Sequence, residues 1–194
     1  MPLALDKSSK LTFRVELPGG QNRLREAILY VCQKCVDAPY FGLTKLNKIL
    51  WIADFDSFAE RAQPVTGRPY QRLEFGPAPV EMRPLLNEMI RDHEIAIENA
   101  RVLKFDERRP RALAVPSLRN FSPADLSYLD HAVERFWNLS GREVSDRSHG
   151  VAWSTRANGD DMPYELSYLD DGPLGANTKG KLMKIATAKK LRSR

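Results

Sequence analysis

The stretch LTKLNKILWIADFDSFAERAQ, residues 43–63, constrains the fold more than any other part of the sequence. Its apolar residues recur at helical spacing and form two stripes on neighbouring faces: Leu43, Leu46, Leu50 and Ala53 in one, and Trp51, Phe55, Phe58 and Ala62 in the other. Two adjacent stripes cover well over half the circumference of a helix. The sequence therefore predicts a central helix that at least two other elements contact, with its aromatic residues in the core.

Helical patterns flank this stretch on both sides. Residues 22–35 have apolar side chains at helical spacing, and a further helix is predicted to have Pro79 or Pro84 in its first turn, where proline is tolerated. Ser122 followed by Pro123 is typical of a helix start. Ser140 and Glu143 have the spacing of a capping box, and the helix they begin is predicted to run toward Trp153.

Strand patterns are short. Leu11 to Leu17 alternates apolar and polar residues at period two, and Tyr70 to Phe75 is a second candidate strand. A hairpin is predicted from Ile95 to Val115, in which Ala112 to Val115 returns and the charged sequence DERRPR, residues 106–111, forms the tip. The predicted fold class is α+β and predominantly α-helical: a compact helical domain around the central helix, with a small antiparallel β-sheet or hairpin.

The charge of the chain is concentrated at its carboxyl end. The 194 residues have a formal net charge of +5, but residues 179–194 contain seven Lys or Arg and no acid. The rest has 23 basic against 25 acidic residues, so it is slightly acidic. With the glycines of residues 171–180, this asymmetry suggests three parts: a strand-like segment at 1–20, a folded domain at 21–170, and a linker with a basic tail at 171–194.

Nothing in the sequence suggests a membrane or an export signal. Residues 1–10 have no apolar core of the kind found in signal peptides, and no apolar run approaches the ~18 residues of a membrane span. The chain is expected to be a cytoplasmic protein with reduced thiols and no membrane partner.

Cys32-x-x-Cys35 raises the question of a metal or redox site. A zinc site would need a second pair of ligands at suitable spacing, and His93, His131 and His149 lie far apart in the sequence. Cysteines on one helical face more often fill a core. The expectation is therefore no metal and no cofactor.

His149 is the one residue with a local pattern for acid–base chemistry. It is three residues after Asp146 and four before Trp153, so the three could share a helix face. No nucleophile motif or glycine-rich phosphate loop accompanies it. A structural histidine that holds a helix end against the core is the preferred interpretation, and no catalytic residue is predicted.

The basic hairpin suggests a DNA-binding alternative. A hairpin beside several helices is typical of winged helices, whose Lys and Arg residues contact phosphates. The candidate helices carry about as many acids as bases, so nucleic acid is the less favoured partner. The candidate partner-binding residues on the hairpin and the tail are Arg108, Arg109, Arg111, Lys189, Lys190 and Arg192.

Four segments, in order and at matching spacing, resemble the Panacea domain of the SocA-like antitoxin family. They are TKLNKILWIADF, GRPYQRLEFGP, FSPADLSYLDHAVERFWNLSGREVSDRSHGVAW and MPYELSYL, and together the resemblance covers roughly residues 22–170. The departures are mild: Trp51 stands where Tyr is usual, Asn47 where Gln is common, and Phe75 where Tyr precedes Gly-Pro. The signature positions, expected to be structural, are Lys45, Leu46, Lys48, Leu50, Trp51, Phe75, Gly76, Pro77, His149 and Trp153.

The resemblance implies both fold and function. The family is mostly helical with a small antiparallel sheet, and its members are antitoxins encoded beside a toxin, often in phage or mobile elements. They neutralise unrelated toxins by direct protein contact, and one acts as an adaptor that presents its toxin to a protease. The expected partners are therefore a cognate toxin and, for an adaptor, a protease. No catalytic residues transfer from the family.

Overall fold

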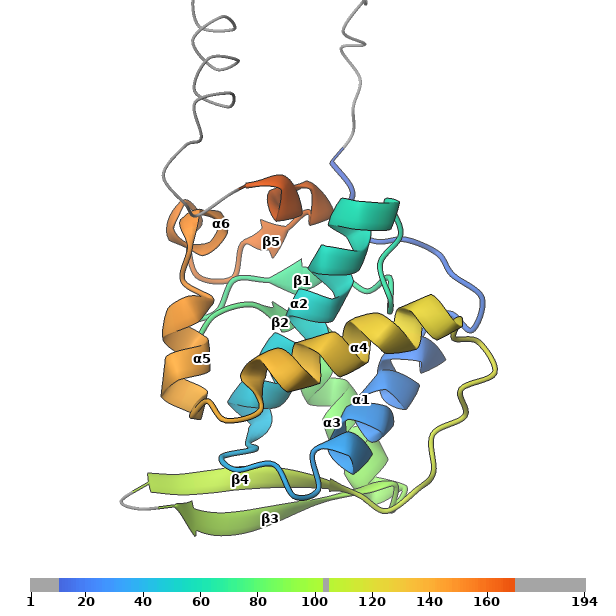
Figure 1. The fold of residues 1–194 in the computed structure, drawn as a ribbon, viewed down its shortest axis with the longest axis vertical. Helices are drawn as coiled ribbons and strands as arrows, with labels where there is room; N and C mark the ends of the chain where they lie inside the picture. The colour runs from blue at the N-terminus through green and yellow to red at the C-terminus, as the bar shows by residue number, and fades with distance from the viewer. Residues whose placement is uncertain (1–10, 103–104, 170–194) are drawn as a thin grey trace, which may run out of the picture.

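Helix α2 (Leu43–Arg61) runs through the middle of the molecule, and the other elements pack around it (Figure 1). In this computed structural model, which describes residues 11–102 and 105–169, α1 (Asn22–Lys34), α4 (Pro123–Phe136) and α5 (Gly141–Arg147) all contact it. Leu46, Ile49 and Leu50 are at most 1% exposed. This confirms the predicted central helix.

Two small antiparallel sheets complete the fold. Strands β2 (Ala78–Pro79), β1 (Tyr70–Gln71) and β5 (Asp161–Met162) form one sheet in that order. Strands β3 (Ile95–Val102) and β4 (Phe105–Ala112) form the other. Helix α3 (Met82–Arg91) precedes β3, and the short α6 (Val151–Ser154) and 3-10 helix η1 (Tyr164–Tyr168) follow α5. The predicted α+β, mainly helical class is confirmed.

The predicted hairpin exists, but its register differs from the prediction. DERRPR is not a tip loop: residues 106–111 lie within β4, with Arg108 opposite Asn99 and Arg111 opposite Ala96. Residues 113–115 lie beyond the strand. Charged residues and a proline disfavour a strand locally, but pairing along the whole of β3 outweighs that preference. The three arginines are therefore spread along a strand and do not lie together at a turn.

Other expected elements are shorter than predicted. Leu11 to Leu17 forms no regular strand, although the Val15 amide donates to the Gly67 carbonyl oxygen at 3.0 Å. The helix from Ser140 ends at Arg147, and the separate α6 begins at Val151, with Gly150 as its N-cap. The predicted N-cap at Ser122 and the predicted capping box at Ser140 are both present, and Asp125 completes a capping box at Ser122 that was not predicted.

The core has two parts. The larger part joins α1, α2, α3 and α4, and it includes Cys32 and Cys35. The smaller part is aromatic: Phe55 contacts Tyr70 edge to face at 5.5 Å between ring centroids, and Phe58 stacks on Tyr164 at 5.1 Å. Trp51 packs against both parts but is only partly buried, so the prediction that it lies fully in the core is wrong.

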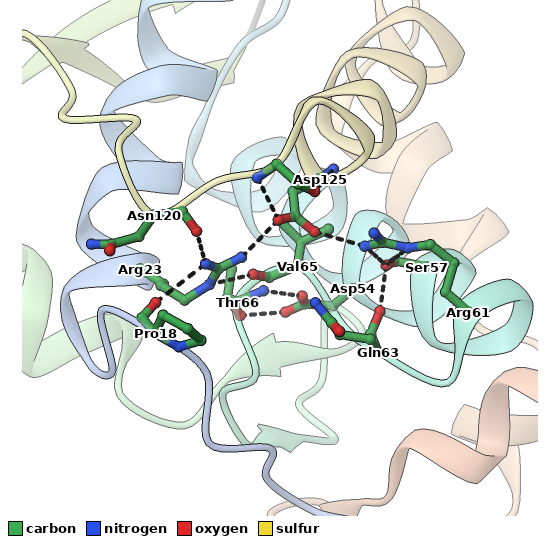
Figure 2. A network of polar contacts seen from close by, with 11 residues as sticks. Pro18, Arg23, Asp54, Ser57, Arg61, Gln63, Val65, Thr66, Asn120 and Asp125 are labelled. Atoms are coloured by element: carbon green, nitrogen blue, oxygen red, sulfur yellow. Dashed lines mark hydrogen bonds and ion pairs between the residues drawn. The ribbon is translucent and has the colours of Figure 1, made fainter.

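A polar network fastens the ends of three helices together (Figure 2). Asp125 in the first turn of α4 accepts hydrogen bonds from Arg23 of α1 at 3.1 Å and from Arg61 of α2 at 2.7 Å. Arg23, only 2% exposed, also donates to the backbone carbonyls of Val65, Pro18 and Asn120. This network links the segment before α1 to the helical core.

Asp54 forms a second buried polar cluster beside this network. It accepts hydrogen bonds from the Thr66 amide at 2.5 Å and from the Tyr70 hydroxyl at 2.8 Å, and the Thr66 hydroxyl also donates to it. Burial raises the pKa of this fully enclosed carboxyl to about 6, although these hydrogen bonds oppose the shift. Asp54 therefore ties the loop after α2 to the middle of the helix.

Among the described helices, none is both long enough and apolar enough to cross a membrane.

Candidate functional site

The two signature lysines lie inside the protein. Lys45 and Lys48 are each 1% exposed, and neither forms an ion pair with a residue that the structure describes. The Lys45 ammonium donates to the Pro39 and Trp137 carbonyl oxygens at 2.6 and 3.1 Å, and the Lys48 ammonium donates to the Pro77 carbonyl oxygen at 2.8 Å. Each lysine therefore holds loops against α2 through backbone contacts.

Burial disfavours the ammonium form of both groups; for Lys45 the nearby carboxylates of Glu107 and Glu143 oppose part of this effect. It lowers the pKa of Lys45, and it lowers the pKa of Lys48 further, to about 7. Lys48 is therefore partly neutral near physiological pH, and a neutral amine can still donate to the Pro77 carbonyl.

Gly76 lets the loop of residues 73–77 lie directly on Lys48. Its φ of +92° is in the left-handed region, and a Cβ there would lie 2.2 Å from the Ser148 Oγ and 2.5 Å from the Lys48 Cε. Any other residue would strain the backbone here and would displace the Ser148 hydroxyl and the Lys48 side chain. Because the Ser145 hydroxyl donates to the Phe75 carbonyl oxygen at 3.1 Å, the loop is also held to α5.

Phe75 is held on this fixed loop with its ring facing solvent. Its side chain is 64% exposed, which is high for a phenylalanine in a loop whose backbone is anchored on both sides. It lies at a groove of about 980 Å³ between the start of α2, β4 and α5, which we call the signature groove. The groove lining includes Tyr40, Thr44, Lys45, Phe75, Arg108, Arg142 and His149.

His149 contributes a stacked ring to this groove. It lies face to face with Trp153 at 3.8 Å between centroids, and the Arg72 guanidinium also lies 3.8 Å from the Trp153 ring. The Trp153 indole donates to the Leu73 carbonyl oxygen at 2.8 Å, so the stack anchors the loop before Phe75. Burial, and then the charge of Lys48, lowers the pKa of His149.

The sequence hypothesis of a His149–Asp146 pair is not realised as a side-chain contact. Within the described residues, the hydrogen bond between them is a backbone one, from the His149 amide to the Asp146 carbonyl oxygen at 3.2 Å. The Ser145 hydroxyl is 3.4 Å from the His149 Nε2 but is directed to the Phe75 carbonyl. The geometry around His149 fits a residue that positions the loop of residues 73–77.

The three arginines of β4 have different surroundings. Arg109 reaches inward and donates to the carbonyl oxygens of Val36 at 2.8 Å and Ala38 at 3.0 Å. Arg111 pairs with Glu98 at 3.0 Å. Arg108 is exposed, lines the signature groove, and has no ion pair within the described part of the chain. Lys189, Lys190 and Arg192 lie outside the described residues.

The two cysteines are part of the core. Cys32 is 3% and Cys35 1% exposed, and burial raises the pKa of both thiols, that of Cys35 to about 12. Within residues 11–102 and 105–169, no group of three or more His, Cys, Asp or Glu side chains is placed to hold a metal ion. The environment around these thiols therefore favours packing and not reactivity.

Sequence reasoning missed some residues that shape this region. Asp54 gave a usable signal, because an acid between Trp51 and Phe55 on an apolar helix face calls for buried partners. Arg83, which lines a neighbouring groove, gave no local signal, and Asn47 stood out only as a departure from the family pattern.

Comparison with known proteins agrees with the arrangement of the signature residues. The model of the family described as Antitoxin SocA-like, Panacea domain matches residues 46–154, more than half of the chain. No curated protein and no solved structure matches this chain. The matched range contains Lys48, the loop with Phe75 and Gly76, and the His149–Trp153 stack. The chain therefore belongs to the SocA-like antitoxin family and contains its Panacea domain.

Proposed function

We propose that this protein is an antitoxin that neutralises a co-encoded toxin by binding it directly. The family match over residues 46–154 is the observation that carries the proposal. The function is that of a binding protein and not of an enzyme, and it is exercised in the cytoplasm. Residues 21–170 form the antitoxin domain in this proposal, and residues 1–20 and 171–194 are appendages to it.

The signature groove is the proposed contact surface for the toxin. Phe75 is an exposed aromatic on a backbone that Ser145 and the Trp153 stack hold in place. Such residues lose little conformational entropy on binding and often supply much of the binding energy at an interface. Arg108 and Arg142 on the same groove add charge at its edge.

The arginines of β4 do not support the DNA-binding alternative. Phosphate contact needs side chains free to reach the backbone of DNA. Arg109 is engaged with carbonyls of the protein, and the charge of Arg111 is offset by Glu98, so Arg108 alone of the three has no partner among the described residues. A direct protein interface therefore fits the hairpin better than a wing does.

The test is co-expression with the product of the adjacent open reading frame. We expect induction of that gene alone to arrest growth, and co-induction of the present protein to restore it. The Phe75→Ala variant should rescue less well at equal abundance. Val115→Ala, which also truncates an exposed apolar side chain, serves as the matched control and should rescue fully.

The level of the toxin during rescue separates two modes of action. Stable toxin in a complex indicates neutralisation by binding alone, and a toxin that disappears when the antitoxin is present indicates delivery to a protease. A neighbour whose induction does not affect growth, or rescue without a physical complex even after cross-linking, contradicts the proposal.

A further inference from the structure

A second groove lies on the other side of Leu43 and Arg108, both of which line it as well as the signature groove. We call it the α3 groove; its volume is about 410 Å³, and its walls come from α2, α3, β3, β4 and residues 71–82. Its lining combines exposed aliphatic side chains, three carboxamides and two arginines. This combination determines which kind of ligand it can hold.

The charge in the α3 groove is of one sign. Arg83 and Arg108 line it, and none of its described lining residues is a carboxylate. Both arginines are exposed, and neither has an ion pair or a side-chain hydrogen bond to a described residue. Two further exposed arginines, Arg91 and Arg135, do have partners, in Asp92 and Asp56 respectively. The groove therefore favours an anionic group.

The carboxamides of the α3 groove suit a peptide backbone. Asn47, Gln71 and Asn87 each offer a donor and an acceptor, and none makes a side-chain hydrogen bond within the described chain. The Asn47 Oδ1 atom is buried and lacks a donor. That enclosed oxygen is out of reach of a ligand, but Gln71 is partly exposed and Asn87 is exposed. These two carboxamides can pair with the N–H and C=O groups of a ligand backbone, which would otherwise lose their hydrogen bonds to water.

The apolar part of the α3 groove restricts the ligand further. Val80 and Ile90 are 39% and 38% exposed, and both lie in its wall. An aliphatic side chain would cover them. An extended segment has free backbone N–H and C=O groups for Gln71 and Asn87, whereas the interior of a helix has already used its own. The groove therefore suits a ligand with three features: a carboxylate, a neighbouring aliphatic side chain and an extended backbone.

We propose that the α3 groove binds an extended acidic segment of the toxin, with an Asp or Glu carboxylate between Arg83 and Arg108 and an aliphatic side chain against Val80 and Ile90. This inference rests on the proposed function, because the toxin is its source of ligand. It places a second contact beside the signature groove and assigns it a different chemistry.

The test uses the purified full-length protein and the purified product of the adjacent gene. Arg83→Glu and Arg108→Glu should each weaken the complex at least about tenfold, since each places a carboxylate where the toxin carboxylate binds. The melting temperature should stay the same, because both side chains are exposed and unpaired. Arg119→Glu is the matched control: Arg119 is also exposed and unpaired within the described chain but lines neither groove.

Photo-cross-linking identifies the toxin segment. A benzophenone amino acid in place of Ile90 should cross-link to an Asp- or Glu-containing segment of the toxin, and one in place of Leu113, which is exposed outside both grooves, should not. Replacing that acid by lysine should restore binding to Arg83→Glu or Arg108→Glu.

The outcomes separate the inference from the proposed function. If the wild-type protein binds the toxin and both glutamate variants bind it with unchanged affinity, the acidic-segment inference is overturned. The proposed antitoxin function is then unaffected. A cross-link to a segment without an acid, or to a helix, also overturns it. If the wild-type protein itself forms no complex, the proposed function fails, and this inference fails with it.

Discussion

Replacing Asp125 by alanine is expected to lower the free energy of unfolding by about 3–5 kcal/mol, measured by chemical denaturation. The carboxylate, 2% exposed, accepts hydrogen bonds from Arg23 and Arg61 and from the Ser122 amide at 2.9 Å. Its loss would leave the buried Arg23 guanidinium without a counter-charge and remove half of the α4 capping box. The three helix ends in Figure 2 would then lose their common anchor.

The control for this prediction is Asp56→Ala. Asp56 pairs with Arg135 at 3.5 Å, with both side chains about half exposed, and such surface pairs contribute about 0–1 kcal/mol. If Asp125→Ala lowers the free energy of unfolding by no more than Asp56→Ala does, the polar network around Asp125 contributes little to stability.

The pH dependence of stability gives a second measurement on Asp125. Burial raises its pKa, but hydrogen bonds from Arg61, Ser122 and Arg23 outweigh burial and lower the pKa below the usual 3.8. A depressed pKa stabilises the fold fully above the unfolded value and loses that contribution as pH falls through the folded value. Acid destabilisation below about pH 4 should therefore be weaker in Asp125→Ala than in the wild type.

Replacing Lys48 by methionine is expected to change the dependence of stability on pH. The pKa of Lys48 falls from 10.5 to about 7 on burial, so between pH 7 and 10.5 the unfolded chain binds more protons than the folded one. The wild type should therefore gain stability as pH rises through this window, at up to about 1.4 kcal/mol per pH unit. Below pH 7, charging the buried amine costs on the order of a few kcal/mol.

Methionine has no charge to bury, so the stability of the Lys48→Met variant should not rise with pH in this window. It should be more stable than the wild type near pH 6. It should be less stable near pH 10, where the neutral lysine still donates to the Pro77 carbonyl and methionine leaves that carbonyl without a partner. Denaturation curves from pH 6 to 10 test this. Parallel profiles for the two proteins would contradict the assignment of a buried, uncompensated Lys48.

Local signals in the sequence predicted local structure well. The N-cap at Ser122, the capping box at Ser140 and the start of α2 follow from residues within one or two turns of each other. The β4 strand was mispredicted because its residues are charged and its pairing with β3 involves partners up to 17 positions away, as in Ile95 with Ala112. The helix break at Gly150 also had only a weak signal, since an isolated glycine is tolerated in helices.

The candidate site could be predicted only in part from the sequence. The resemblance identified Lys45, Lys48, Phe75 and His149, but their roles depend on tertiary contacts. Lysine is almost always a surface residue, so nothing local indicated that Lys48 lies beneath Gly76. The convergence of Phe75, Arg108 and His149 on one groove joins segments from three parts of the chain, and sequence spacing does not encode it.

Calorimetric titration of this protein with the purified product of the adjacent gene tests direct neutralisation. We expect a stoichiometric complex with the wild-type protein and binding at least about tenfold weaker for Phe75→Ala. The melting temperature of Phe75→Ala should be unchanged, and Val115→Ala should bind like the wild type. No complex with the wild-type protein would contradict direct neutralisation. Unchanged binding by Phe75→Ala would contradict the signature groove as the contact surface.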